Sequence, residues 1–180
     1  MLMKIKTDFY TIPDQYGCNI NKSSLNHGIN QQSFPFSIID IPTTANYLSW
    51  SLIDYDTIPL IGLPWIHWLS ANCPVNKTQV LIASNFSKSS TIPQGRNSID
   101  SIVQKLRHPL WKHSKFYLDL TNHYSGPRPM KGTHNYRLSV YATNSPLKLQ
   151  VGFGLNELLN QIDPIMVSET SLNLSYERRI

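Results

Sequence analysis

The sequence predicts a mainly β, antiparallel domain with two or three short helices. Several segments alternate apolar and polar residues with the two-residue period of a strand, whereas only two show helical spacing. Twelve prolines and eight glycines are spread along the chain, a composition typical of many turns between short strands. With 180 residues, 41% of them apolar, the chain is long enough for one substantial core. We therefore expect a single domain spanning residues 1–180.

Several weaker segments complete the expected sheets. Residues 1–33 are polar, rich in Asn, Gln and Ser, and indicate short strands joined by loops. Residues 33–39 resemble a short segment at a sheet edge, and residues 80–84 and 116–120 are expected to form two further short strands. Alternating apolar residues over 172–176 predict a closing strand.

The first strong strand covers residues 47–53, where three large apolar side chains, including Trp50, share one face. Asp54 and Asp56 continue that face by the two-residue period. Two interpretations follow: the acids point into a cavity or its rim, or the strand has ended and they belong to a solvated Asx-type turn before Pro59.

The second strong strand covers residues 65–73, where both faces are largely apolar, as in a strand buried on both sides. Trp65, His67 and Leu69 alternate with Ile66, Trp68 and Ser70. A histidine on such a strand is commonly a hydrogen-bonded core residue, and a functional role for His67 is the alternative.

Two segments have helical spacing. In the first, Ser98 is the expected N-cap and Pro109 stops the helix, with apolar residues at i, i+3, i+4 and i+7: Ile99, Ile102, Val103 and Leu106. The second covers residues 155–162 and is ended by Asp163-Pro164.

A loop with little conformational freedom leads into the third strong strand. Two glycines and two prolines stiffen it: Gly126, Pro127, Pro129 and Gly132. The strand over residues 134–142 alternates cleanly, which places His134 and Tyr136 on its buried face, beside the loop.

The charge of the chain favours anionic partners. The formal net charge is +5 and the pI about 9.2. The basic residues are scattered, with no run longer than two, so we expect no nucleic-acid-binding surface. There is no secretory signal pattern and no run of about 18 apolar residues, so we expect a cytoplasmic protein without stable membrane insertion.

The residues with chemical potential favour binding over catalysis. The chain lacks a P-loop and a Gly-x-Ser-x-Gly elbow, and its histidines and two cysteines do not have metal-ligand spacing, so we expect no cofactor and no metal. What remains is Asp54, His67, His134 and Tyr136, which can bind anionic oxygens by charge-assisted hydrogen bonds. The rings of Trp65 and Tyr136 would exclude water from this pocket. General acid–base catalysis by the same groups is the alternative, but no nucleophile with a sequence signature accompanies them.

Three motifs resemble those of the phosphatidylethanolamine-binding proteins, in particular the bacterial Raf kinase inhibitor-like branch. They are Asp54-Tyr-Asp56-Thr-Ile-Pro59, Trp65-Ile-His67-Trp68 and Gly126-Pro-Arg-Pro129-Met-Lys-Gly-Thr-His134-Asn-Tyr136. The chain departs from the family pattern at Tyr55, at Met130 and at Asn135, and residues 98–113 resemble a helical insertion.

The resemblance implies a β-sandwich and a pocket for phosphate, phosphorylated head groups or other small anions. The implied ligand-binding residues are Asp54, Trp65, His67, Gly126, Pro127, His134 and Tyr136. Asp56 is expected to be a structural turn residue, and Asn135 to face outward. The resemblance also leaves an alternative function, a protein-interaction module that inhibits a kinase or a protease. The pocket mouth and the insertion would then be its contact surface. The bacterial members also imply a homodimer. The physiological ligand and the protein partner remain open.

Overall fold

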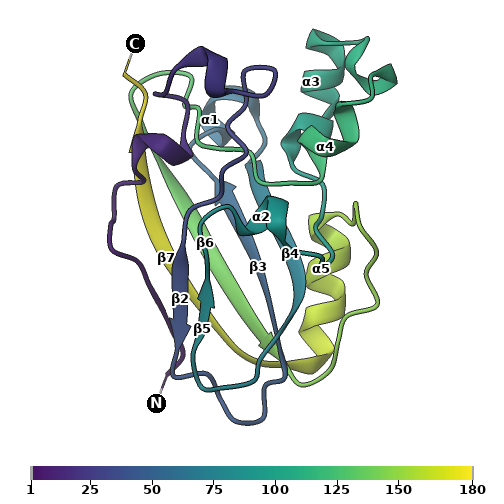
Figure 1. Cartoon of the computed structure of the whole chain (residues 1–180). Coiled ribbons are helices and arrows are strands. Elements are labelled where there is room, and N and C mark those ends of the chain that lie inside the picture. Colours follow the sequence, from purple (N-terminus) through teal and green to yellow (C-terminus); the bar gives the residue numbers. More distant parts are fainter. Residues whose placement is uncertain (1, 180) are drawn as a thin grey trace.

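Two antiparallel sheets face each other in the computed structural model, which describes residues 2–179 (Figure 1). The smaller sheet has the strand order β1 (Lys4–Lys6), β2 (Phe36–Ile39), β5 (Val80–Ile82). The larger sheet has the order β4 (Trp65–Pro74), β3 (Tyr47–Asp54), β6 (Thr133–Thr143), β7 (Met166–Glu177). The mainly β, antiparallel sandwich expected from the sequence is confirmed.

The helices are short and lie in the connections between strands. They are α1 (Ile58–Ile61), α2 (Phe86–Ser89), α3 (Ile102–Arg107), α4 (Tyr117–Thr121) and α5 (Leu155–Ile162). Helix α5 has the predicted bounds. Within residues 2–179, none of the helices combines the length and the apolar character that a membrane crossing requires.

The prediction of a strand at residues 116–120 is wrong, because Tyr117–Thr121 form helix α4. Its buried residues are Tyr117, Leu120 and Thr121, at the i, i+3 and i+4 spacing of a helix, whereas Leu118 is exposed. A segment of five residues with four apolar side chains fits either period, so packing decides its conformation.

The main core lies between the two sheets and is built around aromatic side chains. Phe36 from the small sheet packs edge-on against Trp50 and Trp68 of the large sheet, with ring centroids 5.7 and 6.2 Å away. All three rings are almost completely buried. A second, smaller core lies on the other side of β4, where Leu69 packs against α5 residues including Leu158. Strand β4 is therefore buried on both faces, as its sequence predicts.

A β-bulge in β4 changes which residues face the main core. Opposite Leu52 and Ile53 of β3, strand β4 places Trp68 and Ile66, so His67 is the extra residue between them. His67 packs against the Tyr136 ring of β6, on the side of the main core where Trp68 also lies. The strict alternation expected from the sequence does not hold at this point.

The insertion begins differently from the expected helix. Ser98 is not an N-cap: Asn97 caps a short 3-10 turn (Ser98–Asp100), and Ser101 then caps α3. The Ser98 hydroxyl instead accepts a hydrogen bond from the backbone N–H of Ile66 in β4, at 2.8 Å. The side chain that the sequence suggests as a cap thus joins the insertion to the sheet.

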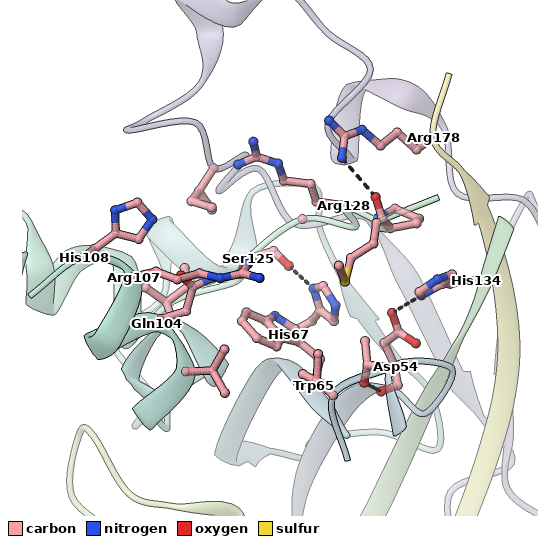
Figure 2. A pocket seen from close by; sticks show the side chains of 18 residues that line it. Asp54, Trp65, His67, Gln104, Arg107, His108, Ser125, Arg128, His134 and Arg178 are labelled. Carbon is pink, nitrogen blue, oxygen red and sulfur yellow. Dashed lines mark hydrogen bonds and ion pairs between the residues drawn. The ribbon is translucent and has the colours of Figure 1, made fainter. Parts of the chain in front are cut away.

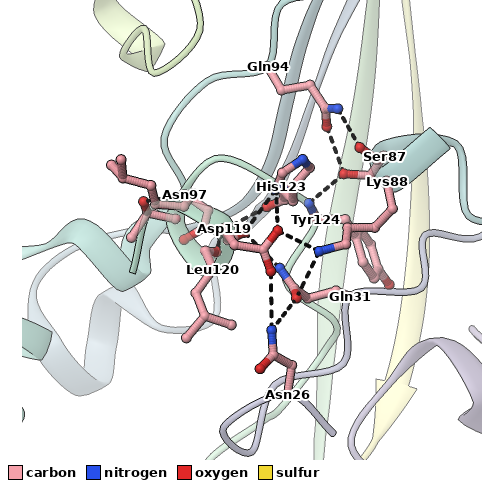
Figure 3. A network of polar contacts seen from close by, with 12 residues as sticks. Asn26, Gln31, Ser87, Lys88, Gln94, Asn97, Asp119, Leu120, His123 and Tyr124 are labelled. Atoms are coloured by element: carbon pink, nitrogen blue, oxygen red, sulfur yellow. Dashed lines mark hydrogen bonds and ion pairs between the residues drawn. The ribbon is translucent and has the colours of Figure 1, made fainter. Parts of the chain in front are cut away.

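A polar network fixes α4, which follows the insertion, to the sandwich (Figure 3). The Asp119 carboxylate pairs with Lys88 at 2.5 Å and accepts from Asn26, while its backbone carbonyl accepts from Gln31. The buried Asn97 amide donates to two backbone carbonyls near the end of α4, both at 2.7 Å. Helices α3 and α4 are therefore held in place on both sides.

Candidate functional site

A cavity of about 360 Å³ opens at the end of the sandwich where α1 and α3 lie. Asp54 at the end of β3, Trp65 and His67 at the start of β4, and His134 at the start of β6 contribute side chains to its wall (Figure 2). The loop of residues 125–130, helices α1 and α3 and the C-terminal segment supply much of the rest of its lining. Segments far apart in the sequence thus meet here.

Asp54 and His134 form a buried pair at the base of this cavity. His134 Nδ1 donates to Asp54 Oδ2 at 2.7 Å, and the two side chains are only 7% and 3% exposed. The other carboxylate oxygen of Asp54 accepts from the backbone N–H of Asp56 at 2.9 Å. The carboxylate therefore forms an Asx turn and lines the cavity at the same time, but the turn at Asp54 is buried and not solvated, and the strand includes this residue.

His67 is fixed by the backbone of the loop that crosses it. Its Nδ1 lies 2.6 Å from the carbonyl oxygen of Ser125, and the Ser125 N–H donates back to the His67 carbonyl at 2.9 Å. Since a carbonyl only accepts, Nδ1 carries a proton. Burial lowers the pKa of His67 below its usual range, although the Ser125 hydrogen bond and the nearby Asp54 oppose this shift.

Tyr136, Pro127 and Gly126 support the cavity in different ways. Tyr136 and Pro127 are buried and do not line it. The Tyr136 ring packs edge-on against the His67 ring, with centroids 5.0 Å apart, and burial raises the pKa of its hydroxyl well above the usual range. Gly126 does line the cavity, and a Cβ atom at this position would lie 2.5 Å from the carbonyl oxygen of Tyr16, so only glycine fits.

Asp56 lies outside the cavity, and its contacts are structural. Its Oδ2 accepts from the backbone N–H of Asn135 at 2.8 Å and from the Asn135 side-chain amide at 3.0 Å. Asn135 is exposed, as the alternation of its strand predicts. The pair ties the turn after β3 to the first residues of β6.

Three arginines that the sequence did not single out also line the cavity. They are Arg107 from α3, Arg128 from the loop, and Arg178 from the segment after β7 (Figure 2). None of them forms an ion pair with a carboxylate among residues 2–179. The basic excess of the chain was a visible signal, but the three positions are distant in sequence and only the fold brings them together.

Several of the polar groups that line the cavity are N–H donors. Arginine and imidazole N–H groups are suited to oxygen anions, and Asp54, the one carboxylate in the lining within residues 2–179, is already paired with His134. Within the same residues, no group of three or more His, Cys, Asp or Glu side chains is placed to hold a metal ion. No hydroxyl in this part of the chain is hydrogen-bonded to either imidazole.

Comparisons with known proteins agree with this architecture. The family described as Phosphatidylethanolamine-binding protein matches residues 4–177. The uncharacterized protein YxkA of Bacillus subtilis (strain 168) is 34% identical over 161 residues, which cover 89% of this chain and 90% of that protein. The crystal structure of Escherichia coli YbcL, described as a new member of the mammalian PEBP family, superposes with a TM-score of 0.70 at 14% identity, covering 99% of this chain and 100% of that one. The crystal structure of CT736 from Chlamydia trachomatis D/UW-3/CX, a putative phosphatidylethanolamine-binding protein homolog, gives a TM-score of 0.64 at 21% identity, over 99% and 98% of the two chains.

Proposed function

Because the chain belongs to the phosphatidylethanolamine-binding protein family, we propose that it binds a small phosphorylated or anionic ligand in this cavity and catalyses no reaction on it. The observation that carries the proposal is the shared geometry of His67 and His134. Each ring has its Nδ1 engaged by a fixed acceptor, a backbone carbonyl in one case and a carboxylate in the other. The Nε2 atom of each ring has no protein partner among residues 2–179 and is available to a ligand.

The surroundings of the two imidazoles support an anion over a cation. A free carboxylate would repel phosphate, but Asp54 is committed to His134 and to the turn at Asp56. In this arrangement Asp54 accepts from Nδ1 of His134 and so fixes the orientation of the ring. Arg107 and Arg128 add positive charge at the wall.

The lack of an activated nucleophile supports binding without catalysis. A serine or threonine nucleophile needs an adjacent base, and neither imidazole contacts a hydroxyl within the described chain. A screen of phosphomonoesters and phosphodiesters is expected to show no turnover above background. Turnover that disappears in His67→Asn would contradict the non-enzymatic assignment.

The binding proposal predicts that His134→Ala weakens phosphate or phosphoethanolamine binding at least about tenfold, because a charge-assisted hydrogen bond is lost from the site. The measurement is titration calorimetry at low salt, with circular dichroism to show that the variant is folded. His113→Gln is the matched control, because His113 is exposed and outside the cavity. Equal affinities of the folded His134→Ala variant and the parent would refute the site.

A second candidate function rests on the exposed apolar residues around the cavity mouth. Helices α1 and α3 line the cavity with Ile61 and with Val103, Gln104 and Arg107. On their outer surfaces and in the adjoining loops they expose large apolar groups: Ile58, Leu60, Leu63, Ile102, Leu106 and Met130. A rim of this kind is suited to a protein partner, such as a kinase or protease that the domain inhibits.

This alternative predicts that a kinase or protease captured by the parent is released by Ile102→Ser combined with Leu106→Ser. Both side chains are more than 60% exposed, so the fold should tolerate the change. Leu81→Ser is the matched control, since Leu81 is equally exposed but lies on β5 of the smaller sheet. The captured enzyme must also lose activity when the purified domain is added, and undiminished activity would rule the alternative out.

A further inference from the structure

Two hollows on the same end of the molecule share a wall made by two arginines. Beside the cavity that contains His67 and His134 lies a second hollow of about 790 Å³. Arg128 and Arg178 line both. The guanidinium groups of Arg128 and Arg178 lie on the same side of the cavity above His67 (Figure 2).

Each of these arginines is held in place while most of its donors stay free. Arg128 donates from one Nη1 to the carbonyl oxygen of Gly28 at 3.0 Å, and Arg178 donates from Nη1 to that of Pro129 at 3.3 Å. A guanidinium has five N–H donors, so several remain on each side chain. Within residues 2–179 neither arginine has a carboxylate partner, which leaves the positive charge of both without a counter-ion.

The charges around the two hollows favour an anion with more than one charged group. Five of the lining residues are Lys or Arg: Lys22, Arg107, Arg128, Arg178 and Arg179. Only two are acidic, and both are engaged, Asp54 with His134 and Asp14 with Arg179. A single phosphate between the imidazoles would leave Arg128 and Arg178 uncompensated.

We infer that Arg128 and Arg178 form a second anion subsite, so that the ligand is a small molecule with two anionic groups. One group, a phosphate, is bound by His67 and His134, and the other, a phosphate or carboxylate, is bound by the two arginines where the hollows meet. This inference rests on the proposed function, since the first group occupies the site already described. It specifies the class of ligand, an elongated molecule with two anionic groups. Such a molecule binds more tightly than a molecule that carries only one anionic group of the same kind.

A series of alkylene bisphosphonates with one to four methylene groups, compared with methylphosphonate, tests the subsite by titration calorimetry on the full chain. At least one bisphosphonate is expected to bind about tenfold or more tightly than methylphosphonate, because it forms additional charge-assisted bonds. In Arg128→Gln and Arg178→Gln this gain should disappear, so that each variant binds the bisphosphonate no more tightly than it binds methylphosphonate. Arg128→Lys, which keeps a positive charge, should retain part of the gain. Arg137→Gln is the matched control, because Arg137 bonds Ser171 on the surface of the large sheet.

The outcomes separate this inference from the function on which it rests. If methylphosphonate binds and no bisphosphonate binds more tightly, or if the gain survives in both arginine variants, the second subsite is refuted and the anion site stands. If no compound binds, the proposed function fails and the subsite with it.

Co-sedimentation with phosphatidylcholine vesicles containing phosphatidylinositol 4-phosphate identifies the source of the two groups. Vesicle binding that Arg128→Gln and Arg178→Gln abolish assigns them to a lipid head group, whereas bisphosphonate binding without vesicle binding assigns them to a soluble molecule.

Discussion

Replacing Asp54 with alanine is expected to lower the free energy of unfolding by about 2–4 kcal/mol, because it leaves two hydrogen-bond donors without their acceptor and a buried donor costs about 1–3 kcal/mol when unsatisfied. The donors are His134 Nδ1, in a buried hydrogen bond, and the backbone N–H of Asp56, in a partly buried one. Both the Asp54 and His134 side chains are less than 10% exposed, so water cannot replace the lost acceptor without rearrangement. Urea denaturation followed by Trp fluorescence gives the unfolding free energy directly.

Two further variants show whether the effect comes from the buried carboxylate. Asp54→Asn keeps an acceptor oxygen of the same shape and should cost less than Asp54→Ala. Asp56→Ala removes the neighbouring acid, whose bonds to Asn135 lie at the surface, and should cost no more than about 1 kcal/mol. A loss below about 1 kcal/mol for Asp54→Ala itself would mean that the pair contributes little to the fold and that the cavity tolerates an unpaired His134.

The strands that build the site could be predicted because their two-residue period is strong. The sequence over 134–142 predicts His134 and Tyr136 on the inner face of a strand, and both are buried there in β6, at 5% and 0% exposure. The same period places Asp54 in line with the core face of β3, where it lies opposite Tyr136. Alternation works here because one face of each segment is apolar and the other polar.

The short segments could not be assigned in this way, because too few residues define their period. In α4, Tyr117 and Leu120 are buried at helical spacing. In the sequence, however, Phe116, Leu118 and Leu120 also fit the two-residue period of a strand. The bulge at His67 is likewise invisible in the sequence, since it depends on the pairing of β4 with β3. It changes the role expected of this position, because His67 reaches the inner side of the sheet together with Trp68.

The three arginines that line the cavity could not be predicted from the sequence, for a different reason. Arg107 lies at the end of a predicted helix, whereas Arg128 and Arg178 lie in a loop and a C-terminal segment that have no periodic pattern. Their convergence follows from long-range packing, such as the hydrogen bond from the backbone N–H of Ile66 to Ser98 that joins the insertion to the sheet. The net charge of +5 indicated an anionic partner without indicating where it binds.

The affinity of the cavity for sulfate is expected to rise as the pH falls from about 8 to 6, by up to about tenfold for each pH unit. Burial lowers the pKa of His67, so its imidazole is neutral in the ligand-free protein near pH 7. A bound anion favours the protonated ring and raises this pKa, so the complex holds more protons than the free protein. Acid therefore promotes binding. Sulfate is the appropriate probe because, unlike a phosphoester, it does not change its own charge in this range.

Titration calorimetry at several pH values, in two buffers with different ionisation enthalpies, measures both the affinity and the uptake of protons. His67→Asn is the critical variant, because the asparagine amide can still donate to the Ser125 carbonyl but carries no titratable group. Asp54, His134 and Tyr136 lie close to His67, so the variant also separates its contribution from theirs. It should bind sulfate more weakly at pH 6 and show a flatter pH profile than the parent. Affinities that do not change between pH 8 and 6, or a slope that is undiminished in His67→Asn, would show that His67 does not bind the anion in its charged form.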